Sequence, residues 1–133
     1  GVRLTLSLLS KVGGRRDLGW VARALRPLAR RLHADRRCDR VGAPFVCPDG
    51  PAAMIIAREL GLPFSVKARG ADIHYWGARA YGRDALLETA REAAGVLAVC
   101  AALADDMATL GMARDTITVH YTGLDRDLFR PMD

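Results

Sequence analysis

Apolar residues recur every three or four positions near the start of the chain, which is the spacing of one face of an α-helix. The pattern predicts a helix over residues 17–35, with most of its arginines lying off the apolar stripe. Pro27 interrupts this segment and has no backbone N–H, so we expect either a kink or two short helices there. The apolar stripe consists of Leu18, Val21, Leu25, Leu28 and Leu32.

The rest of the chain alternates short apolar runs with helical patterns, separated by glycine and proline. Gly61 and Gly111 are expected to end helices, because glycine readily adopts the left-handed conformation found at that position. Strands are predicted over 41–47, 63–68, 96–100 and 116–121, helices over 52–60, 83–94 and 103–110, a long loop over 69–82 and an exit segment over 122–133. This alternation predicts an α/β fold, with a Rossmann-like parallel sheet flanked by helices.

Glycine and charged residues follow the predicted strands at their carboxyl ends, where open α/β sheets bind their ligands. Arg69 carries a planar cation that matches phosphate or carboxylate. Asp72 has two roles open to it: it can accept protons from sugar hydroxyls, or it can hold Arg69 in place. The candidate contacts at this edge are Asp49, Gly50, Arg69, Gly70, Asp72, Thr122 and Gly123.

Each of these motifs also has an ordinary structural explanation when it is taken alone. The Arg69–Asp72 segment can be a surface turn with an internal ion pair. Asp49 and Gly50 can simply cap the following helix, which is their commoner use. His74, with the two aromatic residues that follow it, can stack on a sugar or merely pack within its loop.

The order and spacing of the motifs resemble those of the group 1 glycosyltransferases, a large family with the GT-B fold. The family carries a PDG-like turn, an LGxP link, a [HR]GxD loop and a (N/T)GVDxxxFxP exit. The similarity covers residues 45–131, whereas residues 1–40 match only in their basic, helical character. The matching segments are PDGPAAMIIARELGLPFSVKARGADI and VLAVCAALADDMATLGMARDTITVHYTGLDRDLFRP.

The resemblance implies two Rossmann-like domains that face each other across a cleft. The N-terminal domain would hold the acceptor and the C-terminal domain the sugar nucleotide. Residues 1–121 would then be a partial acceptor-side domain and residues 122–133 the start of the interdomain linker. The first residue is Gly1 rather than Met, so we expect a longer protein in which the missing C-terminal donor domain is the partner of this chain.

The implied activity is that of a hexosyltransferase. It would move a sugar from a nucleotide-sugar donor to a glycan or lipid-linked acceptor, in polysaccharide or glycolipid biosynthesis. The resemblance implies no cofactor, since the nucleotide sugar is a co-substrate bound mainly by the other domain. The chain alone would therefore be inactive.

The chain departs from the family pattern in three places: Cys100 stands where the family carries Ser in a later strand, and the other two departures bear on catalysis. Many members carry His where Arg69 stands, and arginine cannot act as a base at neutral pH. Many members also carry His in the strand before the PDG turn, where Gly42 and Pro44 stand here, and the paired glutamates of the donor domain are absent. We therefore predict no catalytic residue in this chain. Arg69 is expected to neutralise a donor or acceptor phosphate, oriented by Asp72.

Positive charge is concentrated near the start of the chain. The chain has 20 Lys and Arg against 15 Asp and Glu, and one Lys and nine Arg lie between Lys11 and Arg40. Two interpretations of residues 15–40 stay open: a helix that covers the sheet with a solvated charged face, and a surface that binds anionic membrane near lipid-linked acceptors. No apolar run is long enough to span a membrane and no signal peptide is present. We expect a cytoplasmic protein. If residues 15–40 bind membrane, the protein would be attached peripherally to its inner face.

Other functions are less well supported by the residues. Three cysteines without a CxxC pair, and three histidines without ligand spacing, predict no metal site. A GT-B-fold sugar-nucleotide epimerase, or another nucleotide-binding α/β enzyme, shares the expected architecture. A carbohydrate-binding domain is a further alternative. A basic nucleic-acid-binding module would require a recognisable binding motif. None is present, so we expect no nucleic-acid partner.

Overall fold

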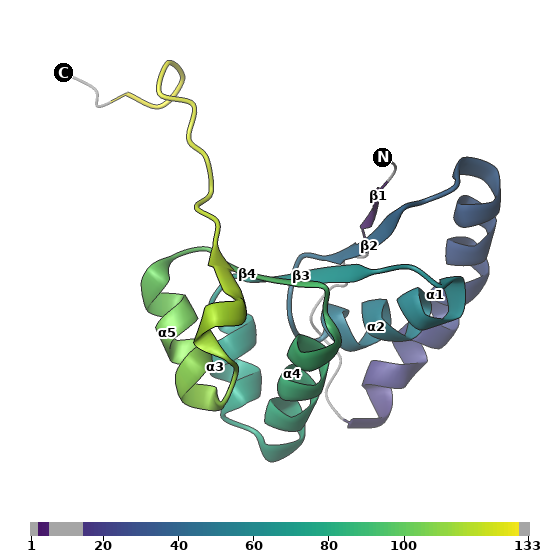
Figure 1. The fold of residues 1–133 in the computed structure, drawn as a ribbon, viewed down its shortest axis with the longest axis horizontal. Helices are drawn as coiled ribbons and strands as arrows, with labels where there is room; N and C mark the ends of the chain where they lie inside the picture. Colours follow the sequence, from purple (N-terminus) through teal and green to yellow (C-terminus); the bar gives the residue numbers. More distant parts are fainter. Residues whose placement is uncertain (1–2, 6–14, 131–133) are drawn as a thin grey trace.

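The computed structural model describes residues 3–5 and 15–130, with side chains from residue 19 onward (Figure 1). It is an α/β fold built on one parallel sheet, in which the strand order follows the chain from β1 to β5. The strands are β1 (Arg3–Thr5), β2 (Arg40–Ala43), β3 (Phe64–Ala68), β4 (Gly95–Ala98) and β5 (Ile117–Val119). The helices are α1 (Arg15–Arg36), α2 (Asp49–Leu60), α3 (Ala71–Gly77), α4 (Ala80–Glu92) and α5 (Ala101–Leu110), with a 3₁₀ turn η1 (Arg114–Thr116). The predicted fold class is confirmed.

The sheet has one face under helices and one face that is partly open. Crossovers between parallel strands are right-handed, so strands laid down in sequential order place their connecting helices on the same side. Figure 1 shows α2, α3, α4 and α5 below the sheet. Along β3, Phe64, Val66 and Ala68 are buried against these helices, whereas Ser65 and Lys67 are only half-buried on the opposite face. The open face therefore offers polar side chains to whatever meets the sheet.

The core lies between the sheet and the helices beneath it. Val66, Val96 and Ile117 stand in register on three neighbouring strands. They belong to one buried cluster with Ile56 of α2, Leu86 of α4 and Met107 of α5, among others. This packing holds the strands parallel to one another, so their carboxyl ends lie along one edge of the sheet.

Helix α1 differs from its predicted form in two respects. It runs unbroken through Pro27, so the expected interruption into two helices is wrong. Proline lacks the backbone N–H that would bond the carbonyl of Arg23 one turn earlier. Both residues are exposed, so water can bond that carbonyl instead. The helix packs on α2 rather than on the sheet. Leu28 is 53% exposed, contrary to the predicted stripe, because the buried positions are taken by Ala22 and Ala29. The side chain of Leu18, also placed on that stripe, lies outside the described residues.

The segment 69–82 is not the loop that was predicted. It contains α3 and the first residues of α4, and the two helices meet in a close corner. A Cβ on Gly82 would lie 2.3 Å from the carbonyl oxygen of Trp76, so only glycine fits there. Trp76 is buried and packs edge-on against Tyr75 and Tyr81, with ring centroids 5.4 Å and 6.1 Å away. A helix of seven residues is too short to show a periodic pattern in the sequence.

Strand β2 is shorter than expected. The prediction extended it to residue 47, but the ladder ends at Ala43 and residues 44–47 continue as an irregular loop. Gly61 and Gly111, by contrast, end α2 and α5 with φ of 65° and 113°, as predicted.

Candidate functional site

The loops that follow β2 and β3 are joined by one carboxylate. Asp72, in the first turn of α3, accepts the backbone N–H of Val46 at 2.9 Å through Oδ2. Its Oδ1 accepts the backbone N–H groups of Arg69 and Gly70, each at 3.0 Å. The PDG turn and the RGAD loop therefore converge at the carboxyl edge of the sheet. We call this edge, made of residues 44–48, 69–72 and 120–123, the rim.

The same contacts change the role expected for Asp72. The residue is 3% exposed and both carboxylate oxygens are engaged with backbone N–H groups. It binds the backbone of Arg69 rather than the guanidinium, so the internal ion pair considered from the sequence is not formed. A carboxylate that accepts three backbone N–H groups is a strong local constraint, because hydrogen bonds to charged acceptors are stronger than neutral ones. Asp72 thus shapes the rim from beneath.

Asp49 and Gly50 lie under the rim and not on it. Asp49 is completely buried. A Cβ on Gly50 would lie 2.7 Å from Cγ2 of Thr89, so the glycine allows the first turn of α2 to pack closely against α4. The structure therefore gives both residues a packing position, whereas the sequence placed them on the cleft face.

Cys47 completes this buried layer. Burial, followed by the negative charges of Asp72 and Asp49, raises the pKa of its thiol from 9.0 to about 12. The thiolate is the nucleophilic form of cysteine, so Cys47 is inert at neutral pH. Among the described residues no group of three or more His, Cys, Asp or Glu side chains is arranged to hold a metal ion.

Arg69 is the cation that the rim exposes to solvent. Its guanidinium carbon lies 5.5 Å from the centroid of the Phe45 ring, in cation–π contact. No carboxylate in the described part of the chain pairs with it. Gly70 turns the chain directly after it with φ of 116° and ψ of −66°, a conformation that residues with a Cβ rarely adopt. The loop thus presents, at the end of β3, an arginine that no described carboxylate neutralises.

The exit after β5 leaves the sheet at the same edge. Thr122 and Gly123 are exposed, and no atom lies within 4 Å of a Cβ built on Gly123. Figure 1 shows this segment extending away from the body of the domain. It therefore shares the edge with the other two motifs. Residues 131–133 of the predicted linker lie outside the described residues.

Lys67 and His120, neither of which was predicted as a substrate-binding residue, connect β3 to the start of the exit segment. The backbone N–H of His120 donates to the carbonyl of Ala98 at 2.8 Å and continues the β4–β5 ladder. Its Nδ1 lies 2.9 Å from Nζ of Lys67. The available signal was the alternation of β3, in which the polar residues Ser65 and Lys67 alternate with apolar ones and must face away from the core.

His74 lies on the helical side of the molecule. Its Nε2 is 3.0 Å from Oδ2 of Asp106 on α5, and the pair lies beside a cavity of about 370 Å³ between α3 and α5. Trp76 is buried, and the exposed ring of Tyr75 is covered by the guanidinium of Arg79 at 3.6 Å. The loop-packing interpretation thus accounts for both aromatic residues that follow His74.

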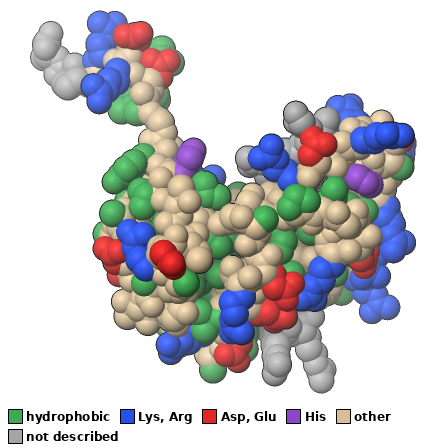
Figure 2. All heavy atoms as spheres, in the orientation of Figure 1, with side chains coloured by type: hydrophobic (Ala, Val, Ile, Leu, Met, Phe, Trp, Pro, Cys, Tyr) green, Lys and Arg blue, Asp and Glu red, His purple; other side chains and the backbone are tan. Residues whose placement is uncertain are grey.

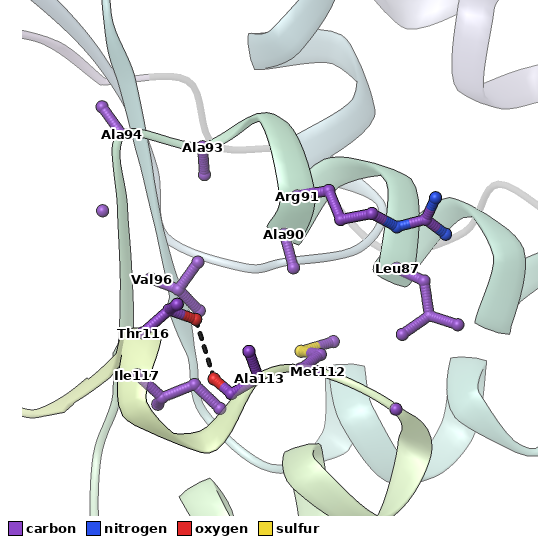
Figure 3. A pocket seen from close by; sticks show the side chains of 12 residues that line it. Leu87, Ala90, Arg91, Ala93, Ala94, Val96, Met112, Ala113, Thr116 and Ile117 are labelled. Carbon is purple, nitrogen blue, oxygen red and sulfur yellow. Dashed lines mark hydrogen bonds between the residues drawn. The ribbon is translucent and has the colours of Figure 1, made fainter.

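A larger cavity lies at the opposite edge of the sheet. Figure 3 shows it between α4 and the segment 111–117, lined mainly by apolar side chains with Arg91 at one side. Its volume is about 580 Å³, and the hydroxyl of Thr116 donates to the carbonyl of Ala113 within its wall at 2.7 Å. It adjoins the amino ends of β4 and β5. Ligands of open α/β sheets bind at the carboxyl ends, which makes the rim the candidate site.

Comparison with known families agrees with this architecture. A model of Glycosyltransferase Family 4 matches residues 6–128, which is most of the chain, and the chain therefore belongs to that family. The match begins well before residue 45, so α1 is part of the family domain although its sequence showed only general basic, helical character. A search of curated proteins finds no significant match. No described helix is long and apolar enough to cross a membrane.

Proposed function

We propose that the enzyme to which this chain belongs moves a hexosyl group from a nucleotide-sugar donor to a glycan or lipid-linked acceptor. The chain would contribute the acceptor side, and a second domain would bind most of the nucleotide. The observation that supports this proposal best is the rim itself. It presents Arg69, which pairs with no carboxylate of the described residues, on a loop held by the buried Asp72.

The chemistry available to Arg69 is binding and not proton transfer. Its fork of N–H donors matches the oxygens of a phosphate group, and it stays protonated throughout the physiological range. In this proposal Arg69 neutralises phosphate on the donor or acceptor, and Asp72 orients it through the backbone. The base that activates the acceptor hydroxyl would come from elsewhere, so the chain alone would not transfer sugar.

A transfer assay with the complete enzyme tests this assignment. Removing one charge-assisted contact to phosphate costs about 1.5–3 kcal/mol, so we expect Arg69→Ala to lower kcat/KM by about tenfold to a hundredfold. Arg69→Lys should retain part of the activity. Arg91→Ala, at the opposite edge, is the matched control and should behave as wild type. Full activity in Arg69→Ala would refute the role of the rim. Conversion of the nucleotide sugar without any acceptor would instead favour an epimerase.

We also propose that α1 contacts an anionic membrane surface, on the inner face, where lipid-linked acceptors would be available. Figure 2 shows Lys and Arg side chains gathered on the side of the molecule that carries α1. The exposed side of that helix also carries two large apolar residues, Trp20 at 65% and Leu28 at 53% exposure. Apolar groups beside cations are the combination that interfacial helices use.

Co-sedimentation with lipid vesicles tests the membrane proposal. The protein should bind vesicles that contain anionic lipid at low salt and should dissociate as salt rises. The double variant Trp20→Ser, Leu28→Ser should bind more weakly while the net charge stays the same. Equal binding of the variant and wild type, or no binding to anionic vesicles, would end the proposal.

A further inference from the structure

The open face of the sheet carries a second cationic group that no motif of the family accounts for. Lys67 lies near the end of β3, two residues before Arg69, and its Nζ lies 2.9 Å from Nδ1 of His120. The two residues are separated by 53 positions in the chain. The sheet brings them together because β4 and β5 follow β3 in register, with Lys67, Leu97 and Thr118 in one row.

The direction of this hydrogen bond follows from the chemistry of the two groups. An ammonium group has three donors and no acceptor, so Nδ1 of His120 must accept and the neutral ring must carry its proton on Nε2. Two N–H groups of Lys67 and the Nε2–H of His120 remain available. The pair therefore presents several donors and one positive charge at a single place.

No anionic side chain of the described residues balances this charge. Every ion pair within that part of the chain involves other cations, and Lys67 has no carboxylate partner. Lys67 is half-buried on the sheet, so it is less well hydrated than a lysine at a helix surface. A partly desolvated cation without a counter-ion attracts an external anion, and the net charge of +5 acts in the same direction.

We infer that Lys67 and His120 form a binding site for a phosphate group at the carboxyl edge of the open sheet face. A tetrahedral phosphate offers enough acceptor oxygens to take the remaining donors of the pair. The inference rests on the proposed function, because the substrates of that reaction carry phosphate either on the nucleotide donor or on a lipid-linked acceptor. The pair adds a second phosphate contact to the one assigned to Arg69, on the side of β3 that faces β5.

Histidine-selective NMR of the 133-residue chain tests the site directly. The chain has three histidines, and the imidazole signal of His120 is assigned by its loss in His120→Gln. The probe is inorganic phosphate, titrated at constant pH and ionic strength. We expect a saturable shift of the His120 signal, whereas His33 and His74 should stay in place. No shift, or an equal and unsaturable shift of all three signals, would overturn the inference.

Variants separate a specific site from general attraction. Lys67→Met should weaken phosphate binding by about tenfold or more, the effect of losing a charge-assisted contact. Lys67→Arg, which keeps the charge, should bind more tightly than Lys67→Met. Arg91→Met removes the same charge at the opposite edge and should bind as wild type. Unchanged His33 and His74 signals in Lys67→Met show that the variant is folded. Equal weakening of phosphate binding in Lys67→Met and Arg91→Met would contradict a specific site at Lys67 and His120.

The source of the phosphate is decided by two further titrations. Tighter binding of a nucleoside diphosphate than of glycerol 3-phosphate would assign the pair to the donor, and the reverse order would assign it to the acceptor. Binding of neither compound would refute the inference. Since no step of this experiment needs sugar transfer, failure to bind phosphate in an active transferase would reject the inference alone. Phosphate binding by the chain, together with a complete enzyme that transfers no sugar, would reject the proposed function alone.

Discussion

Replacing Asp72 by asparagine is the sharpest perturbation that the structure offers. The substitution keeps size and shape, but one oxygen becomes an NH₂ group. Oδ1 of the asparagine can still accept the N–H groups of Arg69 and Gly70. The new amide nitrogen would then face the N–H of Val46, which now bonds Oδ2 at 2.9 Å. Two N–H donors would then face each other at a residue that is only 3% exposed to solvent.

The expected cost follows from these contacts. Loss of one buried hydrogen bond to a charged acceptor costs about 1.5–3 kcal/mol, and the two bonds that remain are weakened because their acceptor becomes neutral. We therefore expect Asp72→Asn to lower the free energy of unfolding by about 2–4 kcal/mol. A domain of this kind has a total stability of about 5–15 kcal/mol, so the change is large.

Urea unfolding followed by circular dichroism measures this effect. With a slope of about 2 kcal/mol per molar urea, the midpoint should fall by about 1–2 M. Asp115→Asn is the matched control, because Asp115 is an exposed acid on η1 and loses the same charge. If the free energies of unfolding of Asp72→Asn and of that control differ by less than about 0.5 kcal/mol, Asp72 does not hold the two loops together.

Two further predictions concern neighbouring residues. In Gly70→Ala the residue would carry a Cβ at φ of 116°, and no atom lies close enough to clash with it. Backbone strain alone should therefore lower the free energy of unfolding by about 1–3 kcal/mol in thermal or urea unfolding, whereas Gly123→Ala should be neutral. Equal stabilities of the two variants would show that the loop relaxes freely. The pKa of Cys47 is raised from 9.0 to about 12, so between these pH values the unfolded chain loses a proton that the folded protein keeps. The free energy of unfolding should therefore fall as pH rises above 9, by up to about 1.4 kcal/mol per pH unit from this group, and urea titrations of Cys47→Ala should show a shallower fall. An equal slope in Cys47→Ala would contradict the buried, protonated thiol.

Local patterns were sufficient to predict most of the sheet and the helices beneath it. Apolar runs identified β3, β4 and β5, and the glycines after α2 and α5 marked helix ends that the structure confirms through their positive φ values. The prediction was wrong for α3, because a helix of seven residues is too short for its apolar residues to show a helical repeat in the sequence. It was also wrong for the middle of α1, where two alanines and not Leu28 face α2.

The contacts within the site could not be derived from the sequence for a different reason. Asp72 reaches Val46 across 26 positions and Lys67 reaches His120 across 53. Neither pairing has a local signal, because each depends on the order and register of the strands. The sequence did indicate that these loops share one edge, since the carboxyl ends of parallel strands lie together. Which side chains of those loops are buried, and which face solvent, required the packing of α2 and α4 beneath them.

Hydrogen exchange of the complete enzyme, with and without bound nucleotide sugar and acceptor, tests the location of the site most directly. If substrates bind at the rim, amide exchange should slow in residues 44–48, 69–72 and 120–123, and the segments 90–96 and 111–117 around the opposite cavity should be unaffected. Protection confined to 90–96 and 111–117 would contradict the account, because it would place substrate at the amino ends of the strands.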